Sequence, residues 1–156
     1  MTNIVFLIAA FFVMEFVAWF SHKYIMHGFL WKWHVDHHRK DHAQGMPKQT
    51  EDKHFEKNDR FFIVFALPAI IGLILGFLIE SQASLYIGMG ITLYGLTYFI
   101  IHDLLIHNRI NVFKGGRHSR YLQALINAHN AHHKPKNKQD FDNYGLLIFP
   151  RRFFRR

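Results

Sequence analysis

The sequence predicts an all-α integral membrane protein with about three membrane-spanning helices and a histidine-rich metal site on the cytoplasmic side. Three long apolar runs indicate the spans, at residues 4–20, 61–79 and 85–101. As helices, these runs would be about 26–28 Å long, close to the roughly 30 Å hydrocarbon core of a bilayer. Two copies of one histidine pattern, within residues 22–38 and 102–133, indicate the metal site.

The chain has 156 residues, and we expect residues 1–156 to form a single domain. The first apolar run has one charged residue, Glu15, and lacks the basic n-region and small-residue cleavage site of a signal peptide. We therefore expect it to be a permanent span. Residues 121–128 and 144–149 are too short for a fourth span and are expected to lie at the interface or pack against other helices, although the choice between three and four spans stays open.

The net charge of +8 is unevenly distributed along the chain. Basic residues follow the first and third apolar runs, whereas the connection at residues 80–84 has none. By the positive-inside rule, both histidine regions lie in the cytoplasm, as in a multi-pass protein of the cell inner membrane. The basic residues would then face anionic lipid headgroups or an acidic protein partner, and not nucleic acid. The absence of cysteine excludes thiolate-ligated haem, iron–sulfur clusters and structural cysteine zinc sites.

The repeated histidine pattern is H-x4-H followed by H-x2-H-H. Because the second and third apolar runs go out and back, both copies should lie at the same membrane face. Three other histidines, His42, His54 and His118, lie in polar loops and are expected to be solvated or structural. The ten histidines of the two copies are the predicted metal ligands: His22, His27, His34, His37, His38, His102, His107, His129, His132 and His133.

The spacing within each copy indicates how these histidines could share metal ions. Residues at i, i+3 and i+4 lie on one face of an α-helix, so the first histidine of each triplet should pair with the other two. The H-x4-H spacing advances about 500°, which leaves the two rings roughly 140° apart. Unless the helix is locally distorted, His22 and His27 should therefore reach different ions. The set predicts two metals with about five nitrogen ligands each; that number suits iron better than structural zinc, but the spacing does not choose the metal.

Carboxylates near the histidines could orient the ligand rings, because ligating imidazoles usually donate their second N–H to an oxygen. Asp103 follows His102 directly and is the strongest candidate. For Asp36, Asp140 and Asp142, a surface salt bridge is an equally good interpretation. Glu15 lies inside a predicted span, where a charge is costly. It is either a functional residue or a structural partner of a basic residue or a ligand histidine.

Three stretches of the sequence resemble a known family. "MEFVAWFSHKYIMHGFLWKWHVDHH", "YGLTYFIIHDLLIHNR" and "NAHNAHH" are similar to the small bacterial β-carotene hydroxylases, which belong to the fatty acid hydroxylase superfamily of membrane-bound, histidine-rich di-iron oxygenases. The resemblance extends from about Met14 to His133. The histidine pattern is typical of the superfamily, and the flanking "HKYIMHG", "WKWH" and "HDLLIHNR" favour the carotenoid branch.

The resemblance implies a monooxygenase that hydroxylates β-ionone rings at C3 and converts β-carotene through β-cryptoxanthin to zeaxanthin. It implies two iron ions bound by the ten motif histidines, with zinc able to take their place in a purified sample, and O2 as co-substrate. The carotenoid would enter from the bilayer. An external electron donor, ferredoxin with its reductase, is implied as well, because Gly115-Gly116 does not form a dinucleotide-binding motif.

Two alternatives remain at this stage. A hydroxylase or ketolase of the same superfamily, acting on a fatty acid, a sterol or a different carotenoid, would use the same ligand set. A histidine-rich metal transporter belongs to a different class of protein. Transporters place their ligands near the bilayer midplane, whereas here the middle of each apolar run lacks histidine and the histidines cluster at one end.

Overall fold

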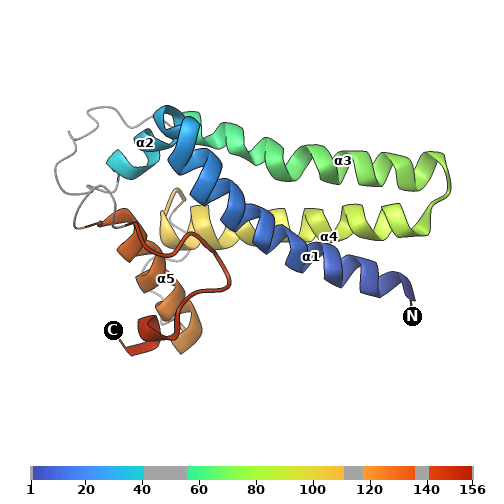
Figure 1. Ribbon diagram of the computed structural model, residues 1–156. Helices are drawn as coiled ribbons and strands as arrows, with labels where there is room; N and C mark the ends of the chain where they lie inside the picture. The colour runs from blue at the N-terminus through green and yellow to red at the C-terminus, as the bar shows by residue number, and fades with distance from the viewer. Residues whose placement is uncertain (1, 41–55, 111–117, 136–140, 156) are drawn as a thin grey trace. The chain divides into compact units, whose positions relative to one another are not determined.

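The structure is a computed structural model that describes residues 2–40, 56–110, 118–135 and 141–155. Every regular element within these ranges is helical, as predicted (Figure 1). His42, His54 and Asp140 lie outside the described residues. The elements in chain order are α1 (Thr2–Phe20), η1 (Ser21–Phe29), α2 (Trp31–Lys40), η2 (Lys57–Phe62), α3 (Ile63–Leu78), α4 (Gln82–Tyr98), η3 (Phe99–Ile106), α5 (Arg120–His133) and η4 (Arg151–Arg155).

Three helices are long and apolar enough to cross a membrane, at Asn3–Phe29, Lys57–Leu78 and Gln82–Ile106. They correspond to the three predicted spans. The first and third extend further than predicted, because π-helices η1 and η3 continue α1 and α4 without a break. His22 and His27 therefore belong to the same continuous helix as the first span. His102 belongs to the helix of the third span, and His107 caps the end of that helix. Residues 121–128 lie within the shorter α5, and 144–149 form no helix, so neither adds a span among the described residues.

The chain divides into two compact units. The first comprises residues 1–17 and 61–112, and the second comprises residues 18–60 and 113–156. In the first unit, α3 and α4 run antiparallel, and α1 crosses α4 (Figure 1). The connection between α3 and α4 is short: Glu80 takes a left-handed conformation with φ of 50°, and Ser81 caps α4 by accepting a hydrogen bond from the Ser84 N–H at 3.3 Å.

Glycines allow the helices of the first unit to approach closely, as is typical of helix pairs in membranes. A Cβ atom on Gly88 would lie 2.7 Å from the backbone nitrogen of Leu73, so α3 and α4 pack almost backbone to backbone. A Cβ on Gly90 would collide with the carbonyl oxygen of Leu7 on α1. The close contacts leave the helices' outer faces, which are rich in exposed Ile, Leu and Phe, to the lipid.

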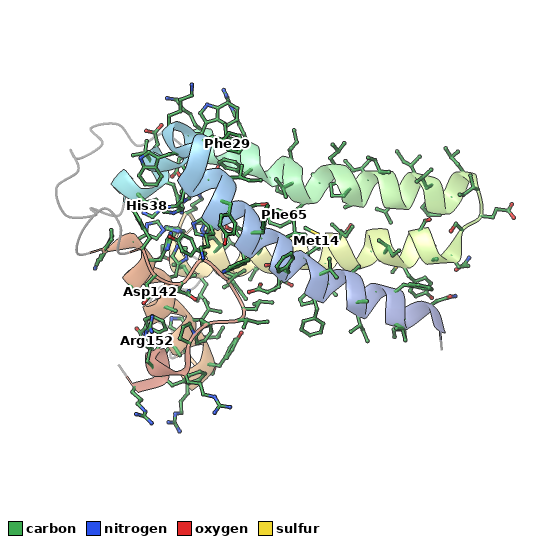
Figure 2. All side chains as sticks on the ribbon, in the orientation of Figure 1. Met14, Phe29, His38, Phe65, Asp142 and Arg152 are labelled. Carbon is green, nitrogen blue, oxygen red and sulfur yellow. The ribbon has the colours of Figure 1, made fainter. Side chains whose placement is uncertain are left out.

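A buried polar pair joins α1 to α4 within this apolar unit. Tyr94 is fully buried, and its hydroxyl donates a hydrogen bond of 2.6 Å to a carboxylate oxygen of Glu15. The Tyr94 ring packs against Phe11 and Phe65, with ring centroids 5.4 and 5.7 Å away. Figure 2 labels Phe65, which lies on α3, and Met14, which lies on α1. The Tyr94 hydroxyl is therefore a structural partner of the Glu15 carboxyl group. From the sequence, a basic residue or a ligand histidine was expected in this role.

In the second unit, the C-terminal segment folds back onto α5. Ser119 caps the start of α5 by accepting a hydrogen bond from the Leu122 N–H. The ring of Phe153 on η4 is buried against Ala124 and Ala128, and the Asn127 side chain donates to the Phe153 carbonyl at 3.4 Å. The small alanine side chains leave room for this ring, so α5 and the C-terminal segment form one packed element.

We expect Gly90→Ala to destabilise the protein, because the added methyl group would collide with the Leu7 carbonyl. The cost should be on the order of 1–3 kcal/mol, as for other overpacked sites. Gly95→Ala is the matched control, since a Cβ there meets only the Phe65 side chain at an ordinary 3.6 Å. It should be neutral or stabilising by up to about 1 kcal/mol through helix propensity. Thermal unfolding in detergent measures both, and equal midpoints would contradict the close crossing of α1 and α4.

Candidate metal centre

Five histidines of the second unit converge on one point. His22 and His27 come from η1, His34 and His38 from α2, and His132 from α5. Each offers one ring nitrogen, and these nitrogens all lie within 4.8 Å of one another. Figure 2 labels His38, which belongs to this group. We call these five residues the five-histidine cluster.

The π-helix η1 explains why His22 and His27 point to the same place. In a π-helix the hydrogen bond joins residue i to i+5, so residues five apart lie above one another and not about 140° apart. The last turn of η1 has this bond, from the Leu30 N–H to the Ile25 carbonyl at 3.0 Å. The centroids of the His22 and His27 rings are 5.1 Å apart. The expectation that these two histidines reach different ions excepted a locally distorted helix, and the π-helix η1 is such a distortion.

The second H-x4-H copy has the same local structure in the first unit. The His107 N–H donates to the His102 carbonyl at 3.0 Å, again from i+5 to i, and the two ring centroids are 4.5 Å apart. The His102 ring also stacks on Tyr98 at 4.7 Å. The repeated spacing in the sequence therefore corresponds to a repeated π-turn in the backbone.

The two histidine triplets are each divided. On α2, His34 and His38 face the five-histidine cluster with their Nε2 atoms 3.1 Å apart. The His37 ring contacts that of His34, as predicted, but its Nδ1 lies 3.1 Å from a Glu56 carboxylate oxygen outside the cluster. On α5, only His132 joins the cluster.

The remaining triplet histidines lie beside one another in the second unit. The His133 ring lies 4.5 Å from the ring of His129 and 4.8 Å from that of His37. It also stacks on His38, a member of the five-histidine cluster, at 4.4 Å. The first histidine of each triplet contacts the other two, as the spacing predicts, but the members of a triplet do not all lie in one group. Histidines three or four residues apart on one helix thus lie partly in the five-histidine cluster and partly in this neighbouring group.

Backbone and amide oxygens orient three rings of the cluster. Carbonyl oxygens can only accept hydrogen bonds, so the Nδ1 atom of each ring must carry the proton. In a neutral imidazole the Nε2 atom then has a lone pair and no proton. The three contacts are His22 Nδ1 to the Tyr144 carbonyl at 3.0 Å, His34 Nδ1 to Asn58 Oδ1 at 2.7 Å, and His132 Nδ1 to the Asp142 carbonyl at 3.0 Å.

The cluster has the donor set of a metal site. The Nε2 atoms of His22 and His34 lie 3.1 Å apart, and both rings have their proton on Nδ1, so two lone pairs face each other. Such lone pairs repel unless a cation lies between them, and the residues therefore fit a bound metal ion. Five ring nitrogens converge here, and this number exceeds the four ligands of structural zinc.

Burial keeps the cluster neutral and ready to bind metal. His34 is 1% exposed and His132 is fully buried. Burial, reinforced by the neighbouring histidines, lowers the pKa of His34 well below its ordinary value of 6.5, and the hydrogen bond to Asn58 opposes this only in part. The pKa of His132 is lowered in the same way. Both rings are thus uncharged imidazoles at neutral pH, and the uncharged form is the one that binds a metal ion.

The carboxylates near the histidines have different roles. Asp103 contacts His102 as predicted, with 3.4 Å between Oδ2 and the ring Nδ1, and Arg109 holds its other oxygen at 3.0 Å. Asp36 forms an ion pair of 3.7 Å with the exposed Lys57, as in the surface salt bridge considered in the sequence analysis. Asp142 orients His132 through its backbone carbonyl, while its side chain forms an ion pair with Arg152. Figure 2 labels both members of that ion pair.

Two supporting residues were missed by the sequence analysis. Glu56 and Asn58 are nearly buried at the end of the polar linker, where they contact His37 and His34. The Glu56 backbone N–H is held in turn by the Asp59 side chain at 2.9 Å. These residues have no histidine-like spacing. Their one signal in the sequence is the position just before the second span.

The helical membrane architecture and the histidine cluster fit a membrane protein with a metal site, and the comparisons with known proteins identify its family. The chain matches the fatty acid hydroxylase family over residues 7–154, and it belongs to this family. It is 38% identical to the β-carotene hydroxylase of Pantoea ananas, over 88% of this chain and 71% of that protein. No solved structure matches the chain.

Further relatives come from bacteria and plants. The chain is 36% identical to the β-carotene hydroxylase of Paracoccus sp. (strain N81106 / MBIC 01143), over 96% of this chain and 86% of that protein. It is also 36% identical to the chloroplastic β-carotene 3-hydroxylase 2 of Arabidopsis thaliana, over 88% of this chain and 42% of that longer protein.

We expect Asn58→Leu to weaken metal binding about 10- to 100-fold, as is usual when a group that orients a ligand histidine is lost. The leucine has a similar volume but cannot accept the proton of His34 Nδ1. Asn58→Asp keeps the acceptor and should retain most of the affinity. Asp36→Asn, which weakens the ion pair with Lys57, is the matched control. Competition with a chelator of known affinity gives the values. Equal affinities for Asn58→Leu and Asp36→Asn would contradict the orienting role of Asn58.

Proposed function

We propose that this protein is a monooxygenase that hydroxylates the β-ionone rings of carotenoids at C3, taking β-carotene through β-cryptoxanthin to zeaxanthin. The observation that carries this proposal is a buried cluster of imidazole lone pairs in a chain that is 35–38% identical to bacterial β-carotene hydroxylases. The cluster lies where the first span ends, so an apolar substrate in the bilayer would be close to the proposed metal ligands.

The proposed cofactor is a pair of iron ions. The five-histidine cluster would hold one, because five converging nitrogens suit the five or six ligands that iron accepts better than the four of structural zinc. The other five motif histidines would hold the second ion: His37, His129, His133, His102 and His107. When bound, the irons would supply the O2 chemistry that no side chain can perform on an unactivated C–H bond.

The chain's own residues prepare this chemistry. Oxygens on the far side of three rings fix the proton on Nδ1 and aim the Nε2 lone pairs at the ion. Burial keeps water away from the ligands. Phe20, Tyr24 and Phe29 are exposed near the metal end of the first span, where a polyene could slide from the lipid towards the cluster. Their other role would be that of an aromatic belt at the membrane interface.

The reaction needs two electrons per turnover, and an external donor would deliver them. The donor we propose is ferredoxin with its reductase. The excess of basic residues beside the histidine motifs would attract an acidic donor from the cytoplasm, and it supports a cytoplasmic metal side for a protein of the inner membrane. Lys23 and Lys32 lie between His22 and His34 in the sequence and are candidates for this contact.

The alternatives differ in what they require of the site. Another hydroxylase or a ketolase of the family would use the same ligands, so the product decides between it and the proposed activity. A transporter would need to release its ion across the membrane. The five-histidine cluster instead lies at the end of a span, and its rings are fixed by hydrogen bonds from several segments.

Expression in bacteria that accumulate β-carotene tests the proposed activity. The wild-type chain should convert β-carotene to β-cryptoxanthin and zeaxanthin, resolved by chromatography and mass. His102→Ala should abolish conversion, whereas His118→Ala, outside both motif copies, should leave it nearly unchanged. Unchanged β-carotene with metal-loaded protein in the membrane would contradict the substrate. Full activity in His102→Ala would contradict the role of the second ligand set.

Metal content tests the assignment of histidines to ions independently of activity. His132→Ala should lose the ion of the five-histidine cluster and retain the other, and His102→Ala should do the reverse. Each variant should therefore keep about half the metal of the wild type, measured by elemental analysis of protein purified after iron loading. A His102→Ala variant with full metal content would contradict the second site.

A further inference from the structure

A surface rich in exposed aromatic and basic residues lies in the C-terminal part of the second unit, apart from the metal ligands. Tyr121 of α5, Phe149 and Phe154 of η4 form a group of rings with centroids 5.5, 5.6 and 6.4 Å apart. Tyr121 and Phe154 are about two-fifths exposed, and Ile148 beside them in the chain is 68% exposed. We call these four residues the C-terminal aromatic surface.

The surface is built into the fold. Phe153 is 1% exposed and fixes η4 against Ala124 and Ala128 of α5. Because Phe153 points inwards, its neighbour Phe154 is turned outwards. The Tyr121 hydroxyl donates to the Leu147 carbonyl at 2.7 Å and so ties the segment before η4 to α5. Exposed large apolar side chains that are held in place in this way indicate a partner surface.

The charges around the aromatic rings are almost all positive. Within residues 118–135 and 141–155, the only acidic residue is Asp142, which already pairs with Arg152. Arg120 is adjacent to Tyr121 in the chain, and Arg155 is adjacent to Phe154. The basic residues of these two ranges are Arg120, Lys134, Arg151, Arg152 and Arg155.

We propose that the C-terminal aromatic surface inserts into the headgroup layer of the membrane and binds anionic phospholipid. An acidic soluble protein would neutralise the arginines, but Ile148 and Phe154 would gain little from its charged surface. An anionic bilayer satisfies both, because apolar side chains enter the acyl boundary while arginines meet phosphate groups.

The connection of α5 to the first span supports this position. The Nε2 atoms of His132 on α5 and His27 on η1 are 3.0 Å apart, so the C-terminal end of α5 is held at the end of a membrane-spanning helix. The 14 residues of α5 span about 21 Å, so Tyr121 lies within that reach of the span. Anchoring the far end of α5 would hold His132 in place relative to the bilayer.

Spin labels on the full-length protein test the proposal, since the chain has no cysteine and each introduced cysteine is unique. Ile148→Cys and Phe154→Cys report on the surface, and Gln123→Cys, about 200° around α5 from Tyr121, is the matched control. In nanodiscs with anionic lipid, the labels at 148 and 154 should collide several-fold more often with oxygen than with a water-soluble nickel chelate, relative to the label at 123. Unchanged metal content verifies the fold.

The dependence of label accessibility on the charge of the protein and the lipid provides a second test. Adding Arg151→Gln and Arg155→Gln, or replacing anionic with zwitterionic lipid, should move the label at Ile148 several-fold towards nickel accessibility. Labels at 148 and 154 that are as accessible to nickel as the label at 123 in anionic nanodiscs would overturn the proposal. So would labels that become shielded only when an acidic soluble protein is added, because the surface would then dock a protein. All of these readouts are independent of the proposed hydroxylase activity.

Discussion

The mutual repulsion of converging imidazole lone pairs is the constraint on which the second unit depends. His22 and His34 hold their Nε2 atoms 3.1 Å apart, and both rings are fixed as Nδ1–H tautomers by oxygens outside the cluster. A cation relieves this repulsion, and its binding would join η1, α2 and α5 through one atom. The segments that supply the oxygens are constrained as well, because each oxygen must stay within hydrogen-bond distance of the Nδ1 atom of its ring. The proposed activity and the integrity of this unit therefore rest on the same ion.

The π-turns connect this constraint to the membrane. A regular α-helix would direct two histidines five residues apart to different sides, whereas η1 and η3 place them together. Both π-helices continue membrane-spanning helices, so each span ends in a pair of aligned rings. The apolar first unit needs a different kind of support. There, glycine contacts bring the backbones together, and the hydrogen bond between Tyr94 and Glu15 accommodates one carboxyl group.

The sequence was sufficient for the helical membrane fold and for the residues of the cluster, because span length and histidine identity are local properties. It was insufficient where geometry depends on the backbone hydrogen-bond pattern or on distant segments. No residue in "HKYIMH" signals a change from i+4 to i+5 bonding, so the sequence could not tell whether His22 and His27 point to the same place. Glu56, Asn58 and the Tyr144 carbonyl meet the histidines only through tertiary folding. The contact between Asp103 and His102 was predictable, because the two residues are adjacent in the sequence.

The most direct test of this account is the iron X-ray absorption spectrum of the full-length protein, purified from membranes and loaded with iron under reducing conditions. The account predicts two irons per chain and a first shell of five or six nitrogen or oxygen neighbours at about 2.1 Å, dominated by imidazole scattering. A single iron per chain, or a four-coordinate shell, would contradict the two-site histidine cage.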